Sequence, residues 1–189
     1  MAPRPPVNSA DPRIPDKDSY DESLGFSRIT AYNWALPDRK NYIPFGVSPD
    51  AWPKPMLEPQ LHSTVPRDVV RVFEIARAAV VYSWFFYPLA TLGLEQCTRV
   101  AEFAAREKCR LLNRASERLY DNLATLLASG VITNEQEFRW QALRQLRNDR
   151  SHLNGFMLTD PGQAAGVLHT TAELINGLFP AETPATRAS

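Results

Sequence analysis

The chain has 189 residues, of which 44% are apolar, and its formal net charge at pH 7 is +0. This length and composition predict one domain with enough core to fold unaided, plus extensions. The balanced charge excludes a protein whose surface is dominated by basic residues. Charge is uneven along the chain, because residues 65–152 hold 12 Arg and 1 Lys against 10 acidic residues, a net +3. The central segment therefore has room for a modest phosphate-binding surface.

The N-terminal segment, residues 1–64, holds 11 of the 16 prolines and seven aromatic residues. Prolines at this frequency exclude a sustained helix or a central strand, so we expect an extended arm. Our hypothesis is that Ile43-Pro44-Phe45-Gly46 and Ala51-Trp52-Pro53 pin the arm onto the helical domain or onto a second subunit. The alternative is a floppy tail with scattered hydrophobic residues. The segment has no apolar run of the kind found in signal peptides, and we expect a cytoplasmic protein.

From Pro66 onwards, apolar residues recur at spacings of three and four, which predicts helices. We expect five of them, at about 66–87, 88–111 and 114–129, from 134 into the 147–152 region, and from 160 to 178. The expected start and stop signals are Thr64, Pro88, Gly130, the capping box Thr133-Asn134-Glu135-Gln136, and Asp160-Pro161. Short connections and the lack of alternating strand patterns predict an all-α, up-and-down bundle over residues 65–178. Residues 179–189 are expected to form a disordered tail.

The faces of these helices follow from the same spacing. We expect Leu92 and Phe103 of the second helix to face the core, and likewise Phe138, Leu143 and Leu146 of the fourth. Outward-facing arginines of the second helix alternate with Glu102 and Glu107. A solvated, salt-bridged face is the favoured interpretation of that pattern, with a phosphate-tracking stripe as the alternative.

Three further classes of site are disfavoured. The uncharged run from Ala78 to Leu94 is interrupted by proline and glycine, so a buried helix corner fits it better than a membrane span. Cys97 and Cys109 lie roughly 18 Å apart along one predicted helix, too far for a disulfide, and we expect reduced thiols. The three histidines are far apart in sequence, so we predict no metal and no cofactor, and we assign no catalytic role to His62 or His169.

The pattern that carries chemistry is Arg147-Asn148-Asp149-Arg150-Ser151-His152, near the end of the fourth predicted helix. Arginine is a permanent cation whose planar fork suits a phosphate, and histidine exchanges a proton near neutral pH. Five residues of helix turn through about 500°, so Arg147 and His152 point about 140° apart. They can share one phosphate if the helix loosens near His152, where Asn154-Gly155 is a stop signal. They can also do so if a second copy brings in its motif across a two-fold axis.

This hexapeptide fits Arg-Asn-x-x-x-His at a helix end in an all-α domain. It resembles the HEPN domain, a helical superfamily named for higher eukaryotic and prokaryotic nucleotide-binding proteins, over roughly residues 65–178. Tyr82-Ser83-Trp84-Phe85-Phe86-Tyr87-Pro88-Leu89 also looks like bacterial members of that group. The N-terminal arm is not covered by the resemblance.

The resemblance implies a mechanism. Many such domains dimerise so that both motifs line one cleft, and the active ones cleave RNA without metal. Arg147 would then bind the scissile phosphate, His152 would transfer a proton at the 2′-OH or the leaving 5′-oxygen, and Asn148 would orient one of them. The expected products are a 2′,3′-cyclic phosphate and a 5′-hydroxyl, and DNA should survive because it lacks the 2′-OH.

Two features complicate this expectation. Asp149 places a negative charge beside the proposed phosphate site, and we assign Arg144 and Arg150 to substrate binding as cations that offset it. His152 near a helix C-terminus also matches the helix dipole without any catalytic role. The leading hypothesis is a homodimeric ribonuclease, a toxin or defence effector with a possible antitoxin partner. The alternatives are a non-catalytic helical module that binds RNA, a nucleotide or a protein, and a structural dimer clasped by the aromatic arm.

Overall fold

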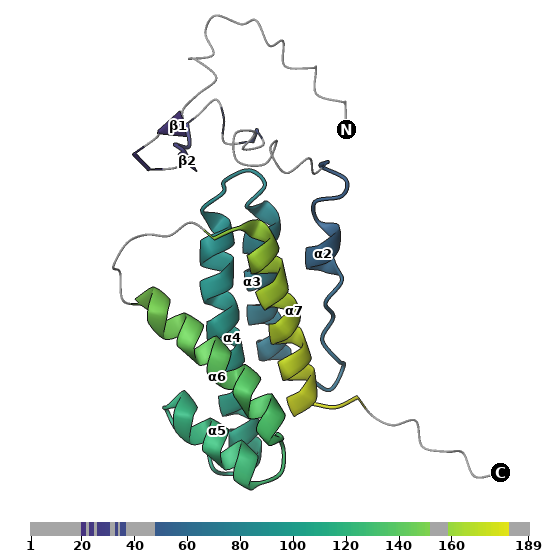
Figure 1. Cartoon of the computed structure of the whole chain (residues 1–189). Helices are drawn as coiled ribbons and strands as arrows, with labels where there is room; N and C mark the ends of the chain where they lie inside the picture. Colours follow the sequence, from purple (N-terminus) through teal and green to yellow (C-terminus); the bar gives the residue numbers. More distant parts are fainter. Residues whose placement is uncertain are drawn as a thin grey trace, which may run out of the picture.

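The computed structural model in Figure 1 describes residues 20–21, 23–24, 26–30, 33, 35–36, 48–151 and 159–181. For residues 20, 21, 27, 147–151 and 161 it describes the backbone alone. The helices are α2 (Lys54–Leu57), α3 (Arg67–Tyr82), α4 (Leu89–Leu111), α5 (Leu119–Ala128), α6 (Asn134–Ser151) and α7 (Pro161–Leu178). Two two-residue strands, β1 (Tyr20–Asp21) and β2 (Phe26–Ser27), pair antiparallel in the arm.

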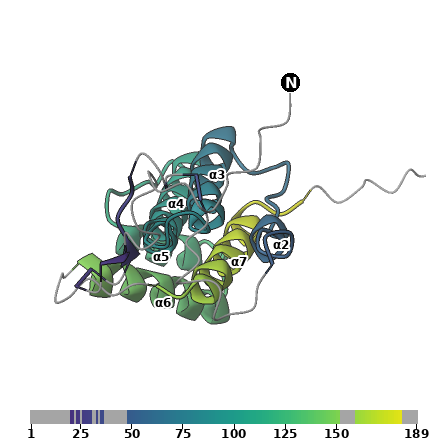
Figure 2. The same ribbon diagram turned by 90° about the horizontal axis from the view of Figure 1, so that it is seen from above.

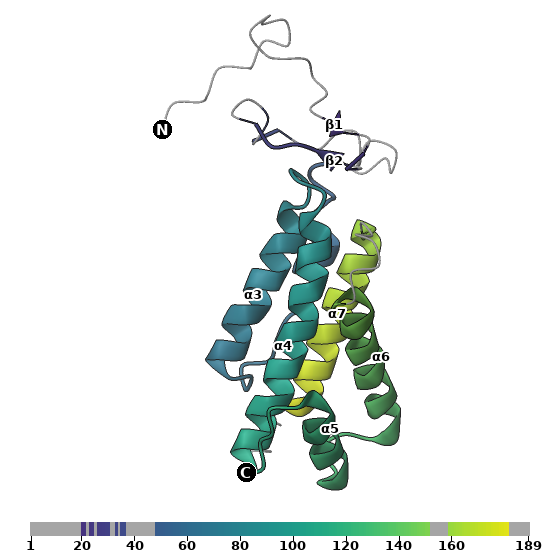
Figure 3. The ribbon, with the colours of Figure 1, turned by 90° about the vertical axis from the view of Figure 1, so that its left-hand side faces the viewer.

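Helices α3, α4, α6 and α7 run alternately up and down, and the short α5 lies at one end of the bundle beside α4 and α6 (Figures 1 and 3). The prediction of an all-α helical bundle is confirmed. Among the described residues, no helix has the length and apolar character needed to cross a membrane.

Helix α4 is the centre of the bundle, and its closest neighbour is α3. A Cβ atom added to Gly93 would lie 2.5 Å from Cγ2 of Val80, so the two helices approach too closely for any side chain at that position. Because Gly93 faces α3, the preceding residue points outward. Leu92 is 50% exposed, and the prediction that it faces the core is wrong.

The connection between α3 and α4 is an aromatic turn, which we define as residues 83–88. The first predicted helix continued to residue 87, but α3 ends at Tyr82. Proline in a helix clashes with the carbonyl four residues earlier, so Pro88 cannot follow a continuous helix through Trp84. Tighter bonds close the end instead, with Phe85 N donating to Tyr82 O at 3.0 Å and Ser83 Oγ donating to Val80 O at 2.6 Å.

The arm packs on this aromatic turn. Trp52 is 7% exposed, its Nε1 donates to Val81 O at 2.8 Å, and its ring centroid lies 5.5 Å from that of Trp84. Phe26 of β2 meets Phe86 edge-on at 5.5 Å, and Figure 3 shows β1 and β2 at the end of the bundle where α3 passes into α4. Docking is therefore confirmed for Trp52. The other proposed anchor, residues 43–46, lies outside the described residues.

Helix α2 lies next to α7, as Figure 2 shows. Residues 58–65, which we call the strap, follow α2 in the chain. Side chains of the bundle bind the backbone of the strap. Asn176 of α7 donates to Gln60 O and accepts from His62 N, both at 2.8 Å, and Arg77 of α3 donates to Pro59 O. Thr64 donates to Phe179 O at 2.7 Å, so the prediction that it caps α3 is wrong.

The expected local signals for the later helices are present. Gln136 N donates to Thr133 Oγ1 at 3.2 Å while Thr133 N donates to Gln136 Oε1 at 2.9 Å, which is a reciprocal capping box. Asp160 caps α7 by accepting from Gln163 N, and Gly130 follows α5 with φ of 67°. These three predictions are confirmed.

The prediction for the inward face of α6 is partly wrong. Phe138 is 77% exposed, whereas Trp140 is 1% exposed and Leu143 is also buried. On a helix, position 138 lies about 160° around the axis from position 140, so both aromatic rings cannot face the core. The bundle buries the larger one.

Replacing Trp52 with alanine tests whether the arm stabilises the bundle. The change removes a buried ring and leaves Val81 O without its side-chain donor, so we expect the free energy of unfolding to fall by about 3–5 kcal/mol. Phe138→Ala is the matched control, because it removes an exposed aromatic ring and should change stability by less than about 0.5 kcal/mol. Urea denaturation measures both. Equal stability of the two variants would show that the arm does not stabilise the bundle.

Candidate functional site

The candidate site is the C-terminal half of α6. The helix extends to Ser151, so the first five residues of the hexapeptide Arg147 to His152 have helical backbone. His152 lies outside the described residues, and the side chains of residues 147–151 are also outside them. The relation between Arg147 and His152 therefore stays a prediction, as do the roles of Asn148 and Arg150.

The rotation of α6 about its axis is set by its buried residues. Trp140 and Leu143 pack into the core shared with α4 and α7, and the capping box fixes where the helix begins. Position 147 follows Trp140 by seven residues, about 700° of rotation, which is 20° short of two full turns. The helical register therefore puts position 147 on the same side of α6 as Trp140. Along that side the sequence changes from apolar to cationic near the C-terminal end.

Arg144 is the one predicted site residue whose side chain the structure describes. Its guanidinium carbon lies 5.9 Å from the ring centroid of Tyr120 on α5, and its Nε donates to Gln141 Oε1 at 2.7 Å. Gln141 in turn donates to Glu137 Oε1 at 3.5 Å, one turn earlier on α6. No carboxylate among the described residues forms an ion pair with Arg144. The role of Arg144 in substrate binding stays a prediction.

Tyr120 is a member of this site that sequence reasoning missed. It is the second residue of α5 and is 59% exposed. The leucines of this helix recur at helical spacing, and Leu119, Leu123 and Leu126 are buried. Tyr120 does not fall on the helical spacing of these leucines, and this could have predicted that its ring is exposed.

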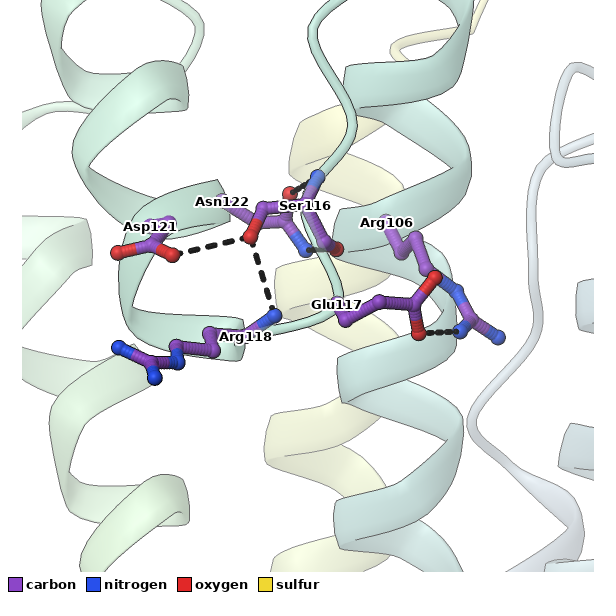
Figure 4. Close-up of polar contacts among 6 residues, drawn as sticks. All are labelled: Arg106, Ser116, Glu117, Arg118, Asp121 and Asn122. Carbon is purple, nitrogen blue, oxygen red and sulfur yellow. Dashed lines mark hydrogen bonds and ion pairs between the residues drawn. The ribbon is translucent and has the colours of Figure 1, made fainter.

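The start of α5, which carries Tyr120, is fixed by a buried polar residue. Asn122 is 1% exposed, and Figure 4 shows its amide paired with the backbone of Ser116: Ser116 N donates to Asn122 Oδ1 and Asn122 Nδ2 donates to Ser116 O, both at 2.8 Å. Ser116 Oγ also accepts from Arg118 N and donates to Asp121. These bonds hold residues 116–118 outside the helix, which is why α5 begins at Leu119 and not at residue 114 as predicted.

Two arginines on the outer face of α4 form ion pairs with acidic neighbours. Arg110 bonds Glu107 through two nitrogens, at 2.8 and 3.0 Å, and Arg106 pairs with Glu117 at 3.2 Å, as seen in Figure 4. The favoured interpretation, a salt-bridged face, is confirmed at these two positions. The phosphate-tracking stripe loses two of its cations.

The two cysteines do not supply a nucleophile. Both are free and buried, as predicted from their spacing, and burial raises the pKa of Cys97 to about 12 and raises the pKa of Cys109. A protonated thiol is a poor nucleophile and a poor metal ligand. In the parts of the chain that the structure describes, no group of three His, Cys, Asp or Glu side chains is arranged to hold a metal ion.

The two described histidines form contacts between the strap and the region of α7. His62 Nδ1 lies 3.3 Å from Phe179 O, and His169 Nε2 lies 3.6 Å from Glu58 Oε2. Both contacts join residues 58–62 to α7 or the residue that follows it.

The buried thiol of Cys97 predicts how stability depends on pH. An unfolded thiol ionises above its ordinary pKa of 9.0, whereas the folded one stays protonated to about 12, so its contribution is complete below pH 9.0 and is lost as pH rises towards 12. Between about pH 8 and about pH 10, the wild type should lose about 1.4 kcal/mol more unfolding free energy than Cys97→Ala. Denaturant titrations across this range measure the difference. Parallel pH profiles for the two proteins would contradict it.

Comparisons of the chain with protein-family models, curated proteins and solved structures found no match. Its function is therefore argued from its own residues.

Proposed function

We propose that this protein is a metal-independent endoribonuclease of the HEPN type, with a composite site at a dimer cleft. The observation that carries the proposal is the sequence Arg147-Asn148-x-x-x-His152 at the C-terminal end of α6 in an all-α, up-and-down bundle. Both the motif and its place in a helical bundle agree with the family that the sequence resembles.

The chemistry needs few groups. The ribose 2′-oxygen attacks the adjacent phosphorus, the bond from phosphorus to the 5′-oxygen breaks, and the products are a 2′,3′-cyclic phosphate and a 5′-hydroxyl. One proton leaves the 2′-OH and one reaches the 5′-oxygen, and His152 performs one of these transfers. Arg147 stabilises the charge that develops on the phosphate, and Asn148 orients the reacting groups. The nucleophile is already attached to the substrate, so positioning contributes much of the rate.

The helical backbone of α6 through Ser151 favours two chains over one. Positions 147 and 152 point about 140° apart if the helical geometry continues. With the helix intact to Ser151, loosening would have to occur within a single residue to bring His152 back beside Arg147. A two-fold axis that places the ends of two α6 helices together removes this requirement, because His152 of one subunit works beside Arg147 of the other.

Arg144 supports the proposal as a second cation. It lies one helical turn before Asn148, has no carboxylate partner among the described residues, and is held by Gln141. A phosphate next to the scissile one would meet this guanidinium. Together with Arg150 it offsets the negative charge of Asp149.

One observation favours a different class of function. The net charge of +0 gives the chain no general attraction to nucleic acid, which favours a non-catalytic helical module, above all one that binds a protein. Such a module would bind without cleaving. Measuring RNA cleavage by the wild type and by the Arg147→Ala and His152→Ala variants distinguishes this module from a ribonuclease.

The ribonuclease proposal predicts the effect of removing each motif residue. At equal folded content, Arg147→Ala should slow the cleavage of single-stranded RNA by about 10²–10³-fold and His152→Ala by about 10²–10⁴-fold. The rate should be unchanged by a chelator, and DNA of the same sequence should remain intact. The measurement is gel analysis of a labelled RNA, with assignment of the product ends.

Arg99→Ala and His169→Ala are the matched controls, because they remove the same residue types from positions outside the site, and both should keep the wild-type rate. An equal rate for the wild type and both motif variants would exclude the ribonuclease. Loss of activity with chelator would exclude the metal-independent mechanism. Growth arrest on expression, relieved by His152→Ala, would support a toxin.

A further inference from the structure

Tyr120 and Arg144 form a pair at the surface where α5 meets α6. The guanidinium of Arg144 lies 5.9 Å from the ring centroid of Tyr120, which is a cation–π arrangement, and the ring remains 59% exposed. The pair therefore combines an exposed aromatic ring with a half-buried guanidinium.

The position of this pair is fixed from both sides. On α5, the buried side chains of Leu119 and Leu123 and the bonds from Asn122 to Ser116 set where Tyr120 lies. On α6, buried Trp140 and Leu143 set the rotation that brings Arg144 to α5. A pair built on two anchored helices is preorganised, so little order has to be gained when a ligand binds.

The pair also lies close to the proposed site. Position 148 follows Arg144 by one turn of α6, about 6 Å along the helix axis, and position 147 follows by about 4.5 Å. A nucleotide next to a phosphate held at position 147 would therefore have its base within reach of the ring of Tyr120.

We propose that Tyr120 and Arg144 are a stacking platform for an unpaired base beside the scissile phosphate, so that the substrate is single-stranded RNA. This inference rests on the proposed function. Bases of single strands and loops stack on aromatic rings and on guanidinium planes, whereas bases inside a duplex are already stacked on each other. The ring supplies the stacking surface, and Arg144 supplies both a stacking plane and a charge for the phosphate.

The test is RNA binding measured by fluorescence anisotropy in the His152→Ala background, which prevents cleavage. The probes are a labelled single-stranded RNA and the same strand annealed to its complement. Tyr120→Ala should weaken binding of the single strand by roughly 5- to 150-fold, the range expected for one stacked base. Tyr120→Phe should bind like the parent, because it keeps the ring. Binding of the duplex should be weaker and unaffected by either change.

Phe138→Ala is the matched control, since it removes an exposed aromatic ring from a part of α6 about 120° around the helix axis from Arg144. It should leave binding unchanged. Tyr120→Ala should melt within about 2 °C of the parent because the ring is exposed, so a loss of binding is not a loss of folding.

The outcomes separate the platform from the ribonuclease. Equal binding by Tyr120→Ala and its parent, or equal losses in Tyr120→Ala and Tyr120→Phe, would overturn the platform and leave the ribonuclease standing. Binding that depends on the ring, in a protein whose wild type does not cleave RNA, would support the platform and exclude the ribonuclease. Failure of the His152→Ala protein to bind the single strand would overturn the platform, whatever the wild-type cleavage assay shows.

Discussion

The candidate site depends on the packing of the buried Trp140 side chain into the core. Trp140 is the largest fully buried side chain among the described residues, and it lies midway along the part of α6 that packs into the core. A buried indole fixes the rotation of its helix because no other orientation fills the same space without voids or strain. That rotation brings Arg144 to Tyr120 and puts position 147 in line with the apolar face. The packing of Trp140 therefore sets the positions of Arg144 and of residue 147, independently of their charges.

A second theme of the fold is the use of polar side chains to hold irregular backbone. Asn122 binds both backbone groups of Ser116, and Asn176 does the same for the strap through Gln60 and His62. An asparagine amide offers both a donor and an acceptor, so one side chain satisfies two backbone groups that no helix or sheet would satisfy. The contacts of Asn176 explain how the non-helical strap, which follows the proline-rich part of the chain, is attached to the helical bundle.

Helix boundaries set by interactions between residues close in sequence were predicted correctly, whereas features set by tertiary packing were not. Thr133 with Gln136, Asp160 with Gln163, and Gly130 are local signals, and each marks the helix boundary that was expected. The end of α3 was misplaced because the bonds of Phe85 and Ser83 close the helix before Pro88. The start of α5 was misplaced because the side chain of Asn122 holds the backbone of Ser116, six residues earlier. Periodicity placed Leu143 and Leu146 of α6 correctly but chose Phe138 over Trp140 as the buried ring, since tertiary packing decides which of the two rings is buried.

For the candidate site too, the sequence predicts only some of its features. The order of Arg147, Asn148 and His152 and their place at a helix end are visible in the sequence. The partnership of Arg144 with Tyr120 depends on how α5 packs against α6, which no local pattern encodes. The relation of Arg147 to His152 involves residues beyond those described, and its dependence on a second chain is part of the proposal.

Subunit complementation tests the shared site most directly. If the chain forms the proposed dimer, Arg147→Ala and His152→Ala proteins that are unfolded together and refolded as a one-to-one mixture would form mixed dimers. One of the two clefts in each mixed dimer would keep both an intact arginine and an intact histidine. If the two groups act across the dimer, the mixture should recover about a quarter of the wild-type rate of RNA cleavage, because about half of the dimers are mixed and each has one working site. A mixture no more active than the separate variants, with subunit exchange verified by labelled chains, would contradict a site shared between two chains.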